Sequence, residues 1–173
     1  MKTLLVMRHA KSSWAVAEDT ADLDRPLTGR GKRDAEAMSA QLVQRGLRPD
    51  ILVHSPAKRC RATAKRLVAG WPGSTQVVED ERLYGCGVAG CRDALAALPD
   101  DALLALLIGH NPAFEDLVRF LTGRWVRMAT CTVACIDMPI QAWQEMETLP
   151  AGTLRFVFGP TGIIATDAGA DQC

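Results

Sequence analysis

Three histidines and two arginines, drawn from distant stretches of the chain, are the residues whose types suggest chemistry. The histidines are His9, His54 and His110, and each comes at or just after the end of a short apolar run. Arg8 precedes His9, and Arg59 follows His54. Arginine forms bidentate hydrogen bonds with phosphate and keeps its charge, and a neutral histidine can attack phosphorus and carry the phosphoryl group. These residues predict a phosphate site with at least one nucleophile, without indicating which histidine attacks.

The apolar runs before the histidines are predicted strands of one sheet. The runs at 3–7, 51–53 and 102–108 are nearly continuous, as expected for strands buried on both faces. Helical patterns separate them, which indicates a mostly parallel sheet with helices on both faces. In such sheets ligands bind beyond the carboxyl ends of the strands. All three histidines are therefore expected at the ligand-binding edge.

The remaining pattern completes an α/β, three-layer α/β/α sandwich. Thr28 and Ser55 are predicted N-caps, and Pro56 is expected at the first helical position. The predicted helices run from these caps to Gly46 and Gly70, from about 88 to 98, and from 111–112 to about 123. Further strands are predicted at 76–78, 131–136 and 154–158. With 173 residues, against roughly 150 per domain, the chain is expected to form a single domain over 1–173.

Charge and hydropathy exclude several partner classes. The chain has 20 Lys and Arg against 20 Asp and Glu, so its net charge is zero, which disfavours nucleic acid as a partner. No apolar run approaches the ~18 residues of a membrane helix, so no membrane partner is expected. The apolar stretch before Arg8 and His9 is too short for a signal-peptide core, and a cytoplasmic location is expected.

The six cysteines are expected to be reduced and to pack as small apolar side chains. Two close pairs, Cys86 with Cys91 and Cys131 with Cys135, have neither the tight spacing of a zinc knuckle nor a nearby histidine. Cys60 and Cys173 stand apart. The sequence therefore predicts no metal site.

Four ordered segments resemble the histidine phosphatase superfamily, also called the phosphoglycerate mutase-like fold, and its SixA-type phosphohistidine phosphatase branch. The segments are Leu5 to Ser12 (LVMRHAKS), Arg25 to Gly31 (RPLTGRG), Ser55 to Ala64 (SPAKRCRATA) and Gly109 to Pro112 (GHNP). The part from Trp143 to Pro160 is also similar. Four blocks in order make the resemblance specific, whereas Arg-His alone would be a weak signal.

The resemblance implies a role for each matching residue. His9 would attack phosphorus and become phosphorylated, and Arg8 and Arg59 would hold the phosphoryl oxygens. His110 would bind the same group and stabilise the charge of the transition state. Water would then hydrolyse the phosphoenzyme, with no cofactor and no metal, because the fixed cations replace one.

Four further residues are weaker pocket candidates. His54 falls on no catalytic position of the family and is expected to support or line the pocket. Ser55 and Thr28 could touch phosphate through their hydroxyl groups, although capping a helix is their simpler role. Lys11 is expected near the mouth, with a solvated charge as the alternative.

A general acid is missing from the expected place. Larger members of the family usually supply a carboxylate after the third strand, but the position after Leu83 and Tyr84 is Gly85. Nearby acids that could serve are Glu79, Asp80 and Glu81. An alkoxide leaving group needs a proton, whereas an imidazole, with a pKa near 6.5, can leave already protonated. The absence of a carboxylate at this position therefore favours a phosphoramidate substrate.

The modest length leaves little room for the insertions that cover the pocket in mutases. An open pocket admits a protein side chain and water, which favours hydrolysis over phosphoryl transfer between sugar positions. We expect a phosphohistidine phosphatase that acts on a phosphorylated protein. The alternatives are a phosphatase for a small phosphorylated substrate, in which one of the three acids reaches the leaving oxygen, and a regulatory phosphate-binding module without turnover.

Overall fold

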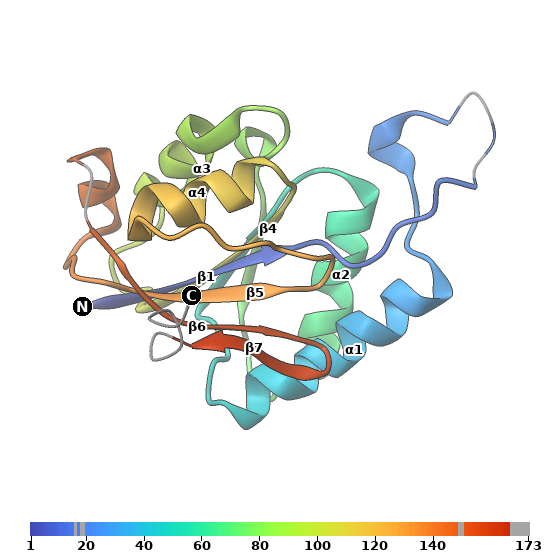
Figure 1. Cartoon of the computed structure of the whole chain (residues 1–173), viewed down its shortest axis with the longest axis horizontal. Coiled ribbons are helices and arrows are strands. Elements are labelled where there is room, and N and C mark those ends of the chain that lie inside the picture. The colour runs from blue at the N-terminus through green and yellow to red at the C-terminus, as the bar shows by residue number, and fades with distance from the viewer. Residues whose placement is uncertain (16, 18–19, 149–150, 167–173) are drawn as a thin grey trace, which may run out of the picture.

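A seven-stranded sheet between two layers of helices organises the part of the chain that the computed structural model describes, residues 1–15, 17, 20–148 and 151–166 (Figure 1). The strands are β1 (Lys2–Arg8), β2 (Ile51–His54), β3 (Gln76–Glu79), β4 (Leu104–Gly109), β5 (Val133–Met138), β6 (Thr153–Gly159) and β7 (Gly162–Thr166). The helices are α1 (Gly29–Gln44), α2 (Lys58–Ala69), α3 (Gly87–Ala96) and α4 (Ala113–Thr122). Three short 3-10 turns join them: η1 (Asp22–Asp24), η2 (Glu81–Leu83) and η3 (Trp143–Thr148).

The sheet has a parallel half and an antiparallel half. The strand order is β3-β2-β4-β1-β5-β6-β7, and the first four strands are parallel to one another. β5, β6 and β7 then pair antiparallel, each with the strand before it in that order. This half includes β7, which the sequence did not predict; it follows β6 through a tight turn, as antiparallel strands allow. The predicted α/β/α class is confirmed.

Helices cover both faces of the sheet, as predicted. In Figure 1, α3 and α4 lie on one face and α1 and α2 on the other. Alternate side chains of β1 enter different cores: Leu4 and Val6 pack with residues of α3 and α4, and Leu5 and Met7 with residues of α1 and α2. Burial on both faces explains why β1 is a continuous apolar run. Among the described residues, no helix is long and apolar enough to cross a membrane.

The start of α2 corrects one prediction. Thr28 caps α1 as expected, since its hydroxyl accepts a hydrogen bond from the Gly31 N–H at 2.9 Å. Ser55 does not cap α2, because that helix begins at Lys58. The Ser55 hydroxyl instead accepts from the Ala57 N–H at 3.3 Å, which closes a turn between strand and helix. The dipeptide Ser-Pro fits either geometry, so the local pattern did not distinguish them.

The strand order brings the three histidine segments together. β1, β4 and β2 are neighbours with their carboxyl ends at one edge. The backbone N–H of His9 donates to the Gly109 carbonyl at 3.1 Å, and the N–H of Ser55 donates to the Ile108 carbonyl at 3.0 Å. The sheet therefore holds these segments in register before any side chain interacts.

A close backbone approach at Gly31 yields a testable prediction. A Cβ atom added there would lie 2.1 Å from the Lys11 carbonyl oxygen, in the segment that follows β1. Because backbone must move to relieve this clash, Gly31→Ala should lower the free energy of unfolding by about 1–3 kcal/mol, measured by urea denaturation. Gly29→Ala is the matched control in the same helical turn, since its Cβ would meet its nearest atom at 3.7 Å. Equal stability of the two variants would contradict the prediction.

Candidate active site

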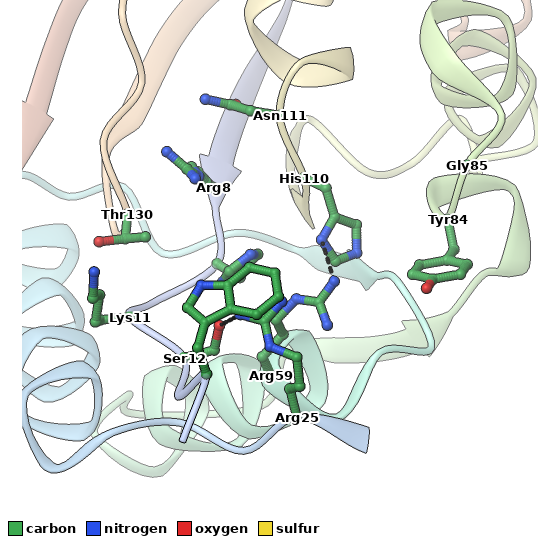
Figure 2. A pocket seen from close by; sticks show the side chains of 12 residues that line it. Arg8, Lys11, Ser12, Arg25, Arg59, Tyr84, Gly85, His110, Asn111 and Thr130 are labelled. Atoms are coloured by element: carbon green, nitrogen blue, oxygen red, sulfur yellow. Dashed lines mark hydrogen bonds between the residues drawn. The ribbon is translucent and has the colours of Figure 1, made fainter. Parts of the chain in front are cut away.

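A cavity of about 470 Å³ opens where β1 and β4 end (Figure 2). Its walls come from the end of β1 and the segment after it, the residue that follows η1, the start of α2, the turn after η2, the loop between β4 and α4, and the loop before β5. The lining residues are Arg8, His9, Lys11, Ser12, Trp14, Arg25, Arg59, Tyr84, Gly85, His110, Asn111 and Thr130. Four of the predicted site residues, Arg8, His9, Arg59 and His110, thus face one space.

Among the described residues, four cationic side chains line the cavity, and two of them, Arg8 and Arg59, have a nitrogen with no partner. In the described part of the chain, the Nε atoms of Arg8 and Arg59 are buried and have no hydrogen-bond acceptor. Arg8 is otherwise fixed by an N–H that donates to the Met128 carbonyl at 2.9 Å. Asn111 donates to the same carbonyl at 2.9 Å. Buried donors without acceptors are rare in folded proteins, so these two are suited to receive an anion.

His9 is a neutral imidazole at the floor of the cavity. Its side chain is buried, and its Nδ1 lies 2.8 Å from the Ala10 carbonyl oxygen. A carbonyl can only accept, so the proton is on Nδ1 and Nε2 keeps a free lone pair. Burial, with smaller contributions from His110, Arg59 and Arg8, lowers the pKa of His9 to about 3. His9 is therefore a neutral nucleophile at neutral pH, with Nε2 unprotonated.

His110 lies edge-on to His9, with 5.2 Å between the ring centroids. Arg59 donates to its Nδ1 at 3.3 Å, so its proton is on Nε2 and points to the Ser55 hydroxyl oxygen at 2.8 Å. Burial and then the charge of Arg59 lower the pKa of His110 to about 4. The Ser55 contact fixes the rotation of this ring, which fits a residue that contacts the same group as His9.

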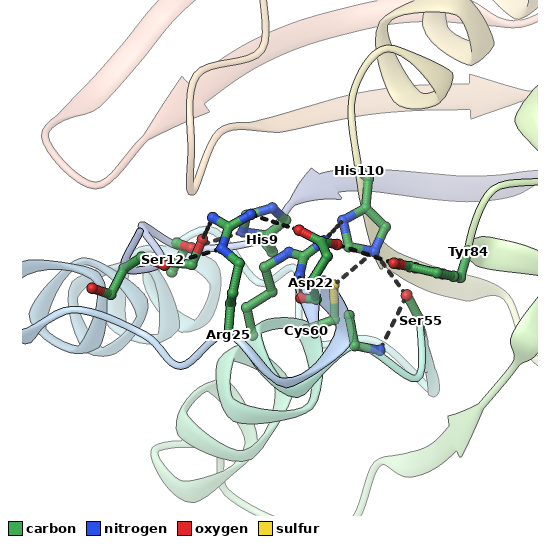
Figure 3. A network of polar contacts seen from close by, with 12 residues as sticks. His9, Ser12, Asp22, Arg25, Ser55, Cys60, Tyr84 and His110 are labelled. Carbon is green, nitrogen blue, oxygen red and sulfur yellow. Dashed lines mark hydrogen bonds and ion pairs between the residues drawn. The ribbon is translucent and has the colours of Figure 1, made fainter. Parts of the chain in front are cut away.

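Asp22 is a site residue that the sequence analysis missed. Its carboxylate bonds to Arg25 at 2.7 Å, Arg59 at 2.9 Å and the Tyr84 hydroxyl at 3.0 Å (Figure 3). Burial opposes ionisation, but these hydrogen bonds lower the pKa of Asp22 to about 2. The carboxylate is therefore ionised and balances part of the cationic charge. Arg25, buried and in the cavity wall, was also not identified beforehand.

The weaker candidates lie in different places. Lys11 lines the cavity, whereas Thr28, Ser55 and His54 do not. The Thr28 hydroxyl donates to the Lys11 carbonyl at 3.2 Å while capping α1. Ser55 is fully buried behind His110, and buried His54 donates from Nδ1 to the Ser55 carbonyl at 2.9 Å. Ser55 and His54 thus support the wall from behind.

The acidic residues after the third strand do not reach the cavity. Glu79 pairs with Arg61 at 2.9 Å, and Asp80 pairs with Arg82 at 2.6 Å. The hydrogen bond from Arg82 lowers the pKa of Asp80. Glu81 is exposed and is not a lining residue. None of the three is placed to protonate a leaving group.

The cysteines form no cross-link within the described residues. Cys60, Cys86, Cys91, Cys131 and Cys135 are free thiols, and Cys173 lies outside the described part. Over that same part of the chain, no three His, Cys, Asp or Glu side chains come together as metal ligands. Burial raises the pKa of Cys60, beside His110, to about 12, so this thiol stays protonated.

Comparisons with known proteins identify the family of this chain and agree with its fold. Residues 4–89 match the model of the histidine phosphatase superfamily (branch 1). An uncharacterized protein of Mycobacterium tuberculosis is 32% identical over 117 residues, which is 68% of this chain and 70% of that protein. Two solved structures are similar to this chain: a putative phosphohistidine phosphatase SixA from Nakamurella multipartitia and a second one from Agrobacterium tumefaciens. The first has a TM-score of 0.80 and 30% identity, covering 93% of this chain and 97% of that one. The second has a TM-score of 0.73 and 26% identity, covering 79% and 92%.

The chain therefore belongs to the histidine phosphatase superfamily and is a phosphatase. Within the superfamily it falls in the SixA-type branch. The resemblance inferred from the four sequence segments is thus confirmed.

The neutral histidines predict how stability depends on pH. In the unfolded chain histidines titrate near 6.5, whereas the lowered pKa values of His9 and His110 keep both neutral in the folded protein. Protons bound only by the unfolded chain destabilise the fold as the pH falls from 7.5 to 5.5. The expected loss in the free energy of unfolding is about 1 kcal/mol for His9 and less for the more exposed His110.

Urea denaturation at both pH values measures this loss. A variant with His9→Gln and His110→Gln is the control, and it should show a smaller loss than the unaltered protein, because it lacks the two histidines whose pKa values the fold lowers. The same loss in both proteins would mean that His9 and His110 ionise normally in the fold.

Proposed function

We propose that this phosphatase hydrolyses phosphohistidine on a protein, through a covalent phosphohistidine formed on His9. One observation carries the proposal: a buried, neutral His9 with a free Nε2 lies beside two arginines whose Nε–H groups have no acceptor among the described residues. A nucleophile and an anion site thus face the same cavity. The names of the two SixA structures, each a putative phosphohistidine phosphatase, support the same substrate class.

In the first step, the Nε2 lone pair of His9 attacks phosphorus and forms a new N–P bond. Arg8 and Arg59 bind the phosphoryl oxygens and stabilise the charge of the transition state. The bond between phosphorus and the substrate imidazole breaks, and its electron pair goes to that nitrogen. A substrate ring that carries a proton on its second nitrogen then leaves as neutral imidazole.

In the second step, water attacks the phosphorus and the His9 Nε2 leaves, which yields inorganic phosphate. The Ala10 carbonyl still accepts the Nδ1–H and holds the ring in place for both steps. A phosphoryl dianion beside His110 offsets the burial that keeps this histidine neutral, so its pKa rises when the group binds. A protonated His110 then donates a hydrogen bond to a phosphoryl oxygen.

The carboxylates near the cavity support a leaving group that needs no acid. Asp22 is ionised and occupied by three donors, and Glu79, Asp80 and Glu81 lie outside the cavity. A sugar or glycerol alkoxide would leave unprotonated from this site, which is slow. Imidazole leaves readily, so the site favours a phosphoramidate over a phosphomonoester. A small phosphorylated molecule remains the alternative substrate.

Removal of the nucleophile should abolish turnover. His9→Ala should lower phosphate release from a phosphohistidine peptide by at least about 1,000-fold, because no other neutral histidine has a free nitrogen at the floor of the cavity. Wild-type protein quenched rapidly in base should carry acid-labile phosphate on His9, located by mass spectrometry. Circular dichroism of the His9→Ala variant checks that it is folded. Label on His54, or wild-type turnover by the variant, would contradict the assignment, and a protein that binds phosphate without turnover would be a regulatory module.

Removal of the three carboxylates after the third strand should leave turnover nearly unchanged. A variant with Glu79→Gln, Asp80→Asn and Glu81→Gln should hydrolyse the phosphohistidine peptide within about threefold of the wild-type rate, since none of the three lines the cavity. General acid catalysis typically contributes about 100 to 10,000-fold. A hundredfold loss in a folded variant would favour the phosphomonoester substrate. Steady-state assays on both substrate types, side by side, measure the outcome.

A further inference from the structure

Two aromatic side chains at the mouth of the cavity have no task in the mechanism above. Trp14 and Tyr84 both line the cavity, and they are 76% and 37% exposed. An indole left so open to water gains little from folding, because exposed apolar surface contributes no burial energy. Their contacts show that both are nevertheless held in fixed positions.

Trp14 is stacked on a rigid support. The Arg25 guanidinium carbon lies 3.3 Å from the centroid of the Trp14 ring. Arg25 itself is only 7% exposed, and its three hydrogen bonds go to the Asp22 carboxylate, the Ser12 hydroxyl and the Ser13 carbonyl at 2.7, 2.7 and 3.0 Å. A cation on one face of an indole holds it in place. The exposure of Trp14 leaves the opposite face free.

Tyr84 is held in place by the Asp22 carboxylate, which also binds Arg25. Its hydroxyl donates to Asp22 at 3.0 Å, and its ring lies edge-on to His110 with 5.5 Å between centroids. Figure 3 shows Asp22 between Arg25 on one side and Tyr84 on the other. One carboxylate therefore anchors both sides of the mouth, so the two aromatic rings keep a constant relation to His9 and His110.

The direction of attack places the leaving group at this mouth. His9 is at the floor, and the attacking and leaving atoms of a phosphoryl transfer are roughly in line. A nitrogen that leaves opposite His9 therefore departs towards the opening. In phosphohistidine this nitrogen belongs to a planar ring, which is cationic when its second nitrogen is protonated. Flat aromatic faces bind planar rings and attract cations.

We propose that the free face of Trp14, together with Tyr84, holds the imidazole ring of the substrate, so that the mouth selects a phosphoramidate whose nitrogen belongs to a ring. This inference rests on the proposed function and extends it from the phosphoryl group to the leaving group. It makes Trp14 a specificity residue that contacts the substrate without taking part in bond making or breaking.

The experiment compares two substrates that share a P–N bond, of which only one has its nitrogen in a ring. One is a phosphohistidine peptide and the other is the ring-free phosphoramidate ion. In Trp14→Leu, the ratio of kcat/KM for the peptide to kcat/KM for phosphoramidate should fall about tenfold, and Trp14→Phe should restore most of it. Trp125→Leu is the matched control, because Trp125 is also highly exposed, at 65%, but is not a lining residue. It should leave the ratio unchanged.

A binding measurement separates this inference from the proposed function. In His9→Ala protein, which cannot form the phosphoenzyme, calorimetry gives the affinity for each compound with and without Trp14→Leu. A loss of affinity for the phosphohistidine peptide alone supports recognition of the ring. This holds even if the wild-type protein releases phosphate from neither compound, because the absence of turnover would reject only the proposed function. An equal loss of affinity for both compounds, or no loss, would overturn the inference. Trp14 would then only pack against Arg25.

Discussion

The site depends on holding two arginines beside two histidines in a mostly buried pocket. Cations brought out of water without counter-charge repel one another and resist burial. Asp22 supplies one carboxylate to Arg25 and Arg59, while Arg8 is held by the Met128 carbonyl alone among the acceptors that the structure records. Burial, together with the remaining positive potential, lowers the pKa values of His9 and His110, so both rings stay neutral. The excess of positive charge over negative charge makes the pocket unfavourable to bury. The same excess attracts an anion, next to a neutral histidine that can attack it.

The balance also explains why net charge said little about function. The chain is neutral as a whole, and its cationic cluster is assembled only by folding, from segments around residues 8, 25 and 59. A site of this kind attracts a dianion locally without attracting polyanions to the whole surface. Chemical selectivity is then set at the opening, where residues from other segments contact what the phosphoryl group is attached to.

The parts of the structure that follow from short-range patterns of residues were predictable from the sequence. Continuous apolar runs identified β1, β2 and β4, and the rule that ligands bind at carboxyl strand ends brought Arg8, His9 and His110 to one edge. Asp22 escaped notice because its partners Arg59 and Tyr84 are far away in the chain, and no spacing rule links them. β7 escaped because exposed side chains such as Ile163 give no amphipathic pattern. Ser55 was assigned to a helix cap because Ser-Pro suits both a cap and a turn, and its contact with His110 forms only in the fold.

The central position of β1 has a consequence for how the protein is made. β1 pairs with β4 on one side and with β5 on the other, and the Cys131 N–H donates to the carbonyls of Arg8 and His9. β1 therefore pairs only after β4 and β5, which lie about 100 and 130 residues downstream of it, have been synthesised. Such long-range pairing slows folding and leaves both edges of β1 open to other strands in the meantime. The nucleophile is thus synthesised well before β4 and β5, but its chemical character arises only once those strands have paired with β1.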